Sequence, residues 1–168
     1  MSIDPGADRM GIAVLDYDKL TGATEYVYST KWECVRGADT YQDYRLRLVK
    51  EYTENAEICF GFHAPDILIN EILPVKGFNN SAQIFLAHAA LGAVQGTAYA
   101  LEIPVMQVSA LTVKTRIGGT KKATKVGVRN GVLQVFPELL PKKYQLVADE
   151  SDAIAIGLTH LGYDLRTP

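Results

Sequence analysis

The sequence contains few cysteines, and they are far apart. Cys34 and Cys59 form no C-x-x-C pair, and no histidine stands at zinc-finger spacing from either of them. The chain therefore has no sign of a zinc finger or of a disulfide framework, and we expect two buried free thiols.

Long hydrophobic runs are also missing. No apolar run approaches the roughly 18 residues needed to cross a bilayer, and no basic, apolar leader stands at the start. Because 48% of the 168 residues are apolar, which is ample for a core at this size, we expect one globular domain over residues 1–168. We expect it to be soluble and cytoplasmic.

Negative charge is absent from one long interval. The formal net charge of −2 argues against a general nucleic-acid coat, but no acidic residue lies between Glu102 and Glu138. Basic runs are usually solvated helix faces, yet the complete lack of acids here favours phosphate contact. The basic residues of the interval are Lys114, Arg116, Lys121, Lys122, Lys125 and Arg129.

The first 35 residues have the alternation and turn residues of antiparallel strands. We expect a short strand ending at Asp4, and a second strand that begins near Arg9 after a sharp turn at Pro5-Gly6. Two more strands are expected, over Ala23–Thr30 and Lys31–Val35. Short turns between consecutive strands predict an antiparallel meander.

From Thr40 onward, helices and single strands alternate. Apolar spacing predicts a helix that is capped by Asp39 or Thr40 and ended by Pro65, followed by a buried strand at Ile67–Ile69. The elements expected after it are a helix over 82–101, a strand over 104–108, a helical turn from Ser109, a helix within 121–136 and a last helix over 149–161. This order predicts an α/β fold of the ribonuclease H-like class, a mixed sheet with helices on both faces.

Acidic residues from three segments are the candidates for chemistry. Asp4 ends the first strand, Glu71 follows the strand at 67–69, and Asp149 and Asp152 lie at i and i+3 on one helix face. Carboxylates are the ligands that Mg²⁺ prefers. Two divalent ions about 3.5–4 Å apart can activate water and stabilise a leaving alkoxide. We therefore predict a divalent-metal site at these four acids, with room for two ions.

Each acid alone has a simpler explanation. Asp4 would be a turn residue, Asp149 a helix cap, and Asp152 a residue that favours the helix dipole. Glu71, at the exit of a strand, has the weakest structural explanation. The metal site is therefore the better interpretation of the set.

Three other features have less definite roles. We expect Glu150 to face solvent, although its place between two acids makes it a reserve candidate ligand. His160 is more often a packed helix residue than a ligand. The helix over 82–101 is rich in Ala and Gly, which suits close packing in the core or at a dimer interface.

Short motifs, taken in order and at similar separations, resemble the RuvC family of Holliday junction resolvases. Each motif is weak alone, since Asp-Pro-Gly occurs in many turns, but the ordered set covers nearly the whole chain and is fairly specific. The motifs are Ile3-Asp4-Pro5-Gly6, Ile69-Asn70-Glu71, Val113-Lys114, Lys122-Ala123-Thr124-Lys125 and the run from Asp149 to His160.

The resemblance implies a homodimer that nicks two strands of a four-way DNA junction symmetrically with Mg²⁺ or Mn²⁺. The compact, divergent sequence suggests a phage-borne or mobile-element version, active in the host cytoplasm and on other branched DNA such as forks and flaps. The residues that match the family's catalytic metal ligands are Asp4, Glu71, Asp149 and Asp152, and those that match its basic residues near the scissile phosphate are Lys114 and Lys125.

Two features depart from the family pattern. The chain begins almost at Asp4, so we expect an unusually short first strand. Many cellular members have an aromatic wedge three residues after the glutamate, where this sequence has Pro74. Phe78 is the nearest aromatic residue and is our candidate for DNA contact at the junction, together with the basic residues Lys114, Arg116, Lys121, Lys122 and Lys125.

Other classes of function compete with this interpretation. The run from Asp8 to Val14 resembles a motif of YqgF-like RNA-processing nucleases. The lysine segment and the last helix argue against membership of that class. A non-catalytic module that binds branched nucleic acid would lack one of the acids, and none is missing. An actin-like phosphotransferase needs two such domains, so the length excludes it. DNA and RNA both stay open as substrates.

Overall fold

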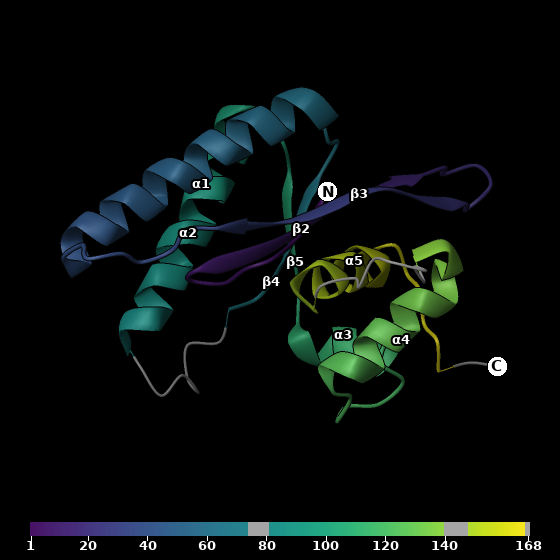
Figure 1. The fold of residues 1–168 in the computed structure, drawn as a ribbon. Coiled ribbons are helices and arrows are strands. Elements are labelled where there is room, and N and C mark those ends of the chain that lie inside the picture. Colours follow the sequence, from purple (N-terminus) through teal and green to yellow (C-terminus); the bar gives the residue numbers. More distant parts are fainter. Residues whose placement is uncertain (74–80, 140–147, 167–168) are drawn as a thin grey trace.

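A five-stranded mixed sheet forms the centre of the computed structural model, which describes residues 1–73, 81–139 and 148–166 (Figure 1). β1 (Ser2–Asp4), β2 (Arg9–Tyr17) and β3 (Thr24–Glu33) are antiparallel. β4 (Leu68–Glu71) pairs in parallel with β1, and β5 (Val105–Val108) pairs in parallel with β4. The strand order β3-β2-β1-β4-β5 places the carboxyl ends of β1 and β4 side by side.

Helices cover both faces of this sheet. Figure 1 shows α1 and α2 together on one side and α3, α4 and α5 together on the other. The described helices are α1 (Tyr41–His63), α2 (Ser81–Ala100), α3 (Ala110–Arg116), α4 (Lys125–Val135), the 3-10 helix η1 (Pro137–Leu139) and α5 (Ala148–His160). The predicted fold class is therefore confirmed.

The core is divided in two by the sheet. On β2, Ile12 packs into the cluster beneath α1 and α2, whereas its neighbour Ala13 packs into the cluster beneath α3, α4 and α5. Leu68 and Ile69 of β4 divide in the same way. Successive side chains of a strand point to opposite faces, so the continuous apolar run in β4 is the pattern of a strand covered on both sides.

Local signals set the bounds of the helices. Thr40 caps α1 by accepting a hydrogen bond from the Asp43 backbone N–H, and α1 ends before Ala64, which is left-handed (φ 41°) and precedes Pro65. Ser109 caps α3 and Thr124 caps α4 in the same manner as Thr40. The predicted start and end of the first helix are confirmed.

One predicted strand is wrong. Lys31–Val35 is not a separate strand, because β3 continues through Thr30 and Lys31 to Glu33, and Lys31 pairs with Gly11 of β2. The sequence has no turn residue between Thr30 and Lys31 that could separate two strands. Glu71 was expected just after a strand, but it is the last residue of β4 itself and pairs with Val108.

Helix α5 lies directly on the centre of the sheet. A Cβ atom on Gly11 of β2 would come within 1.9 Å of the Asp149 carbonyl oxygen, so the start of α5 needs glycine beneath it. Ser2 Oγ of β1 donates a hydrogen bond of 2.7 Å to the Ala153 carbonyl. These contacts bring the acidic end of α5 to the end of β1 that carries Asp4.

The structure also bears on the predictions about the cysteines and about membrane-spanning segments. Cys34 and Cys59 are both buried and free, as predicted. Across the described ranges, no helix is both long enough and apolar enough to cross a membrane.

Candidate active site

Three of the predicted acids line one cavity. Asp4 and Glu71 end the adjacent parallel strands β1 and β4, and Asp152 reaches them from α5. The cavity has a volume of about 270 Å³, and Lys114 of α3 and Lys125 of α4 also line it. The fold thus brings together side chains from five elements that the sequence separates by up to 148 positions (152 − 4).

Asp149, the fourth predicted acid, is linked to this group through Lys125. The ammonium nitrogen of Lys125 lies 2.9 Å from Asp152 Oδ2 and 3.6 Å from Asp149 Oδ1. Asp149 does not itself line the cavity, but the two α5 carboxylates share one cation.

The carboxylates affect one another's protonation. Burial, and then the charges of Asp152 and Glu71, raise the pKa of Asp4 to about 8. Burial and the charge of Asp152 also raise the pKa of Glu71. Burial lowers the pKa of Lys125, but its hydrogen bond to Asp152 and the surrounding carboxylates outweigh this effect and raise it. The site has more negative charge than its lysines balance, and such a site favours a bound cation.

Divalent cations fit the donor atoms of this site. Among the described residues, no three His, Cys, Asp or Glu side chains stand close enough together to hold a metal ion as they are placed, and Lys125 lies between Asp149 and Asp152. All four predicted ligands offer carboxylate oxygens, which hard divalent cations prefer. The raised pKa values of Asp4, Glu71 and Asp152 indicate charges that a metal ion would stabilise.

Glu71 is attached to a buried amide pair that sequence reasoning missed. The fully buried Asn70 donates from Nδ2 to the Glu71 carbonyl at 2.9 Å and accepts from Gln95 Nε2 of α2 at 2.9 Å. The available signal was a polar residue inside an otherwise apolar strand, because such a residue needs a hydrogen-bond partner.

The expectation that Glu150 faces solvent is wrong. Its side chain is 7% exposed, and it accepts a hydrogen bond of 2.8 Å from Ser29 Oγ of β3. The reason is its helical phase, because Ala153, Ile154 and Gly157, at i+3, i+4 and i+7, form the face of α5 that lies on the sheet. That spacing was readable from the sequence.

The predicted DNA-binding residues do not all lie near the acids. Lys114, Lys121 and Lys122 are exposed, the last two in the segment that leads to Lys125. Arg116 is not brought to the acids, because its guanidinium donates to the Thr159 carbonyl, at 3.5 Å, near the opposite end of α5. Phe78 and Pro74 lie outside the described residues.

His160 is also far from the acids. It lines a separate cavity of about 730 Å³ at the other end of the sheet, with Met1 and His63 among the lining residues. The structure therefore places it away from the candidate metal ligands.

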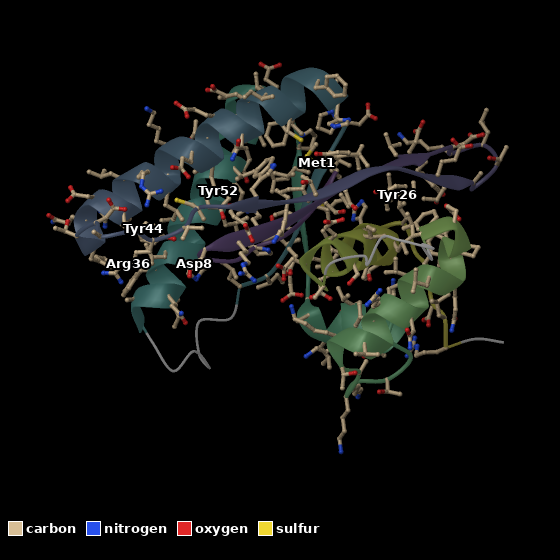
Figure 2. The ribbon with its side chains drawn as sticks, viewed as in Figure 1. Met1, Asp8, Tyr26, Arg36, Tyr44 and Tyr52 are labelled. Carbon is tan, nitrogen blue, oxygen red and sulfur yellow. The ribbon has the colours of Figure 1, made fainter. Side chains whose placement is uncertain are left out.

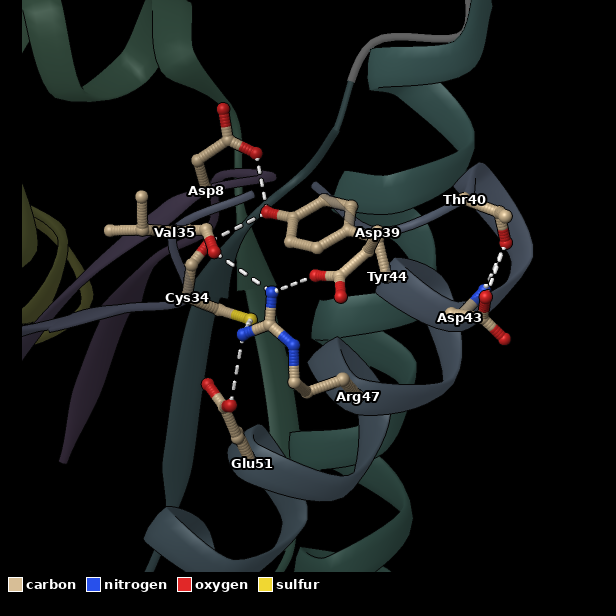
Figure 3. Close-up of polar contacts among 9 residues, drawn as sticks. All are labelled: Asp8, Cys34, Val35, Asp39, Thr40, Asp43, Tyr44, Arg47 and Glu51. Carbon is tan, nitrogen blue, oxygen red and sulfur yellow. Dashed lines mark hydrogen bonds and ion pairs between the residues drawn. The ribbon is translucent and has the colours of Figure 1, made fainter. Parts of the chain in front are cut away.

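A second polar network supports the hairpin that follows Asp4 (Figure 3). The Tyr44 hydroxyl of α1 shares its hydrogen between Asp8 Oδ1, at 2.7 Å, and the Cys34 carbonyl, at 2.6 Å. Arg47 donates to Asp39, Glu51 and the Val35 carbonyl. Figure 3 shows these contacts joining the hairpin and the segment after β3 to α1. Sequence reasoning missed this network.

This chain is similar to known proteins over nearly its whole length. The family model described as "Crossover junction endodeoxyribonuclease RuvC" matches residues 1–160. The curated protein of that name from Stenotrophomonas maltophilia (strain R551-3) is 26% identical over 160 residues, covering 95% of this chain and 86% of its own length. The one from Mannheimia succiniciproducens is 31% identical over 167 residues, covering 95% and 73%.

A solved structure is similar over nearly the same span. The structure titled "T. thermophilus RuvC in complex with Holliday junction substrate" matches with a TM-score of 0.72 at 22% identity, over 95% of this chain and 90% of that one. At this identity the likeness shows the shared fold.

Proposed function

Because this chain belongs to the RuvC family of crossover junction endodeoxyribonucleases, we propose that it resolves four-way DNA junctions by metal-dependent hydrolysis of phosphodiesters. The observation that carries the proposal is the cavity where Asp4, Glu71 and Asp152 face Lys114 and Lys125. Acids that hold cations and lysines that contact phosphate are the two groups such a reaction needs.

The four acids have the metal-binding role in this proposal. Asp4, Glu71, Asp149 and Asp152 hold Mg²⁺ or Mn²⁺, and we propose two ions. When bound, these ions supply an activated water and charge stabilisation for the leaving oxygen.

The lysines have a different role. The Lys125 side chain is 65% exposed, so its ammonium can turn from Asp149 and Asp152 toward a phosphate. Lys114 lines the same cavity. Both are placed to stabilise negative charge that grows on the phosphate in the transition state. Lys121 and Lys122 contact neighbouring phosphates and contribute to binding.

Paired nicks need two active sites related by a two-fold axis, so we propose a homodimer. Helix α2 supports this proposal. A Cβ atom on Gly92 or Gly96 would meet no atom of the described residues within 4 Å, so packing among those residues does not require either glycine. The exposed Phe85 and Tyr99 lie on the same helix. A second copy could approach α2 closely.

We also propose that the substrate range extends to other branched DNA, so that forks and flaps are cut as well as four-way junctions, in the cytoplasm.

The purified protein with Mg²⁺ should be tested on a four-way junction, a flap, linear duplex DNA and structured RNA. The proposal expects cleavage of the junction, weaker cleavage of the flap and little cleavage of the duplex. Cleavage of RNA in preference to the junction would instead support an RNA-processing nuclease, and binding without cleavage would support a non-catalytic module.

A further inference from the structure

We infer that Glu150 is a positioning residue, which with Ser29 fixes the first turn of α5 to β3 and so sets where Asp149 and Asp152 point. The inference rests on the proposed function, because these two aspartates are the metal ligands proposed from α5.

A directed chain of hydrogen bonds ends on Glu150. Ser29 has one hydroxyl hydrogen, and it donates to Glu150 Oε2 at 2.8 Å. The Tyr26 hydroxyl, 3.0 Å from Ser29 Oγ, must therefore be the donor in that second contact. Tyr26 lies where β3 passes α4 and α5 (Figure 2), with its ring 6.2 Å from that of Phe136. The Glu150 carboxylate thus accepts a hydrogen bond from the Ser29 hydroxyl, which in turn accepts one from the Tyr26 hydroxyl.

Stability alone does not explain an acid at this position. Burying a carboxylate costs free energy that one neutral hydrogen bond does not fully return. An apolar residue would attach a helix to a sheet more favourably, as Ile154 does one turn later on the same face. A buried, directional contact is useful where the orientation of the helix matters more than its affinity for the sheet.

Contacts with three neighbouring strands fix the orientation of α5. The Asp149 carbonyl lies against Gly11 of β2, and the Ala153 carbonyl accepts from Ser2 of β1. Both contacts use the helix backbone and lie over the two central strands. The contact of Glu150 with Ser29 is made by a side chain and reaches β3, at the edge of the sheet.

The contact on β3 restrains rotation of α5 about its own axis. Asp149 and Asp152 stand one residue before and two residues after Glu150, so a rotation of the first turn moves both carboxylates relative to Asp4 and Glu71. Residues that orient metal ligands typically change metal affinity by about 10–100-fold when they are replaced.

The inference predicts three outcomes for variants at this contact. Glu150→Ala and Ser29→Ala each remove it, and we expect each to raise the Mn²⁺ concentration needed for half-saturation about tenfold. Glu150→Gln keeps the length and an acceptor oxygen, and should stay within about twofold of the unchanged protein.

A matched control comes from the other end of the same helix. Thr159 is buried and donates from Oγ1 to the Ala155 carbonyl at 2.7 Å. Thr159→Val removes one buried hydroxyl from α5 without touching the acidic end. It should lower the melting temperature without changing the Mn²⁺ concentration for half-saturation.

Two readouts should be taken for the unchanged protein and each variant. The first is the rise in melting temperature on titration with Mn²⁺, which measures metal binding without any cleavage. The second is the Mn²⁺ dependence of single-turnover cleavage of a four-way junction. Asp149→Asn is included as the variant that removes a proposed ligand.

Loss of Mn²⁺ affinity in Ser29→Ala, with recovery in Glu150→Gln, supports the inference. It is overturned if Ser29→Ala and Thr159→Val respond to Mn²⁺ alike, or if Glu150→Gln is as impaired as Ser29→Ala. Ser29→Ala decides the matter even if Glu150→Ala does not fold. Failure of the proposed function looks different, because then the unchanged protein itself neither responds to Mn²⁺ nor cleaves the junction.

Discussion

Asp4 and Asp149 contribute carboxylates from two different elements, and an amide in place of either one is a poorer ligand for a divalent cation. We expect Asp4→Asn and Asp149→Asn each to reduce single-turnover cleavage of a four-way junction by about a thousandfold or more, a small part of the acceleration typical of enzymes. Junction binding should stay largely intact, because removing negative charge does not weaken phosphate contact. Cleavage that persisted in either variant would refute the assignment of that residue.

Asp4 also predicts how pH affects stability when a chelator is present. In the unfolded chain its carboxyl ionises near the ordinary pKa of 3.8, whereas in the folded chain burial and neighbouring acids raise the pKa to about 8. Between these values the folded chain binds more protons, so stability falls as pH rises through this window. Melting temperatures in EDTA should therefore decrease from about pH 5 to pH 8.

Asp4→Asn is the control for this pH dependence. It should flatten the decrease and give a higher melting temperature than the unchanged protein at pH 8, because the amide has no charge to bury. Parallel curves for the two proteins would show that Asp4 does not titrate in this way.

At the scale of elements, the segment from α3 to α4 separates two kinds of lysine. Lys114 and Lys125 line the cavity with the acids, whereas Lys121 and Lys122 are exposed before α4. Replacing Lys114 or Lys125 by Ala should slow cleavage of bound junction by about 10²-fold, because we propose that each stabilises charge that develops in the transition state.

Lys121→Ala and Lys122→Ala should act on binding instead. Each loss of a phosphate contact should reduce the slope of log affinity against log salt by about one unit, with little change in the rate for bound junction. Equal single-turnover rates in all four lysine variants would contradict the division and leave the segment as a uniform basic surface.

Prediction from the sequence succeeded where the signal was local. Thr40 and Pro65 set the start and the end of α1 through their own backbone and side-chain chemistry. The apolar run before Glu71 indicated a strand buried on both faces. Asp4 and Glu71 were each predicted at the end of a strand, and the parallel pairing of β1 with β4 brings the two ends to the same edge of the sheet.

Prediction failed where the decisive contact was distant in sequence. Ser29 and Glu150 are 121 residues apart, Asn70 and Gln95 are 25 apart, and Asp8 and Tyr44 are 36 apart. Each pair depends on which helix lies on which strand, and residue spacing alone does not reveal that. The continuity of β3 was missed for a different reason, because the lack of a turn residue between Thr30 and Lys31 is a local signal that already favoured one continuous strand.

At the scale of the whole molecule, symmetric cutting requires two copies of the chain. Gly92→Leu and Gly96→Leu should weaken self-association by about tenfold or more, because a larger side chain would keep a second copy from approaching α2 closely. We expect the fold to tolerate both changes, since a Cβ atom at either position meets no atom of the described residues within 4 Å. Sedimentation across micromolar concentrations, with and without junction DNA, measures this. A protein that was monomeric in both conditions would contradict the dimer.

The most direct test of the central claim is to map the nicks on a four-way junction labelled on each of its four strands in turn. In Mg²⁺ the account predicts paired nicks at symmetric positions on two opposing strands, which EDTA or Asp4→Asn abolishes. Nicks at unrelated positions on all four strands, or nicks that persist in EDTA, would contradict it.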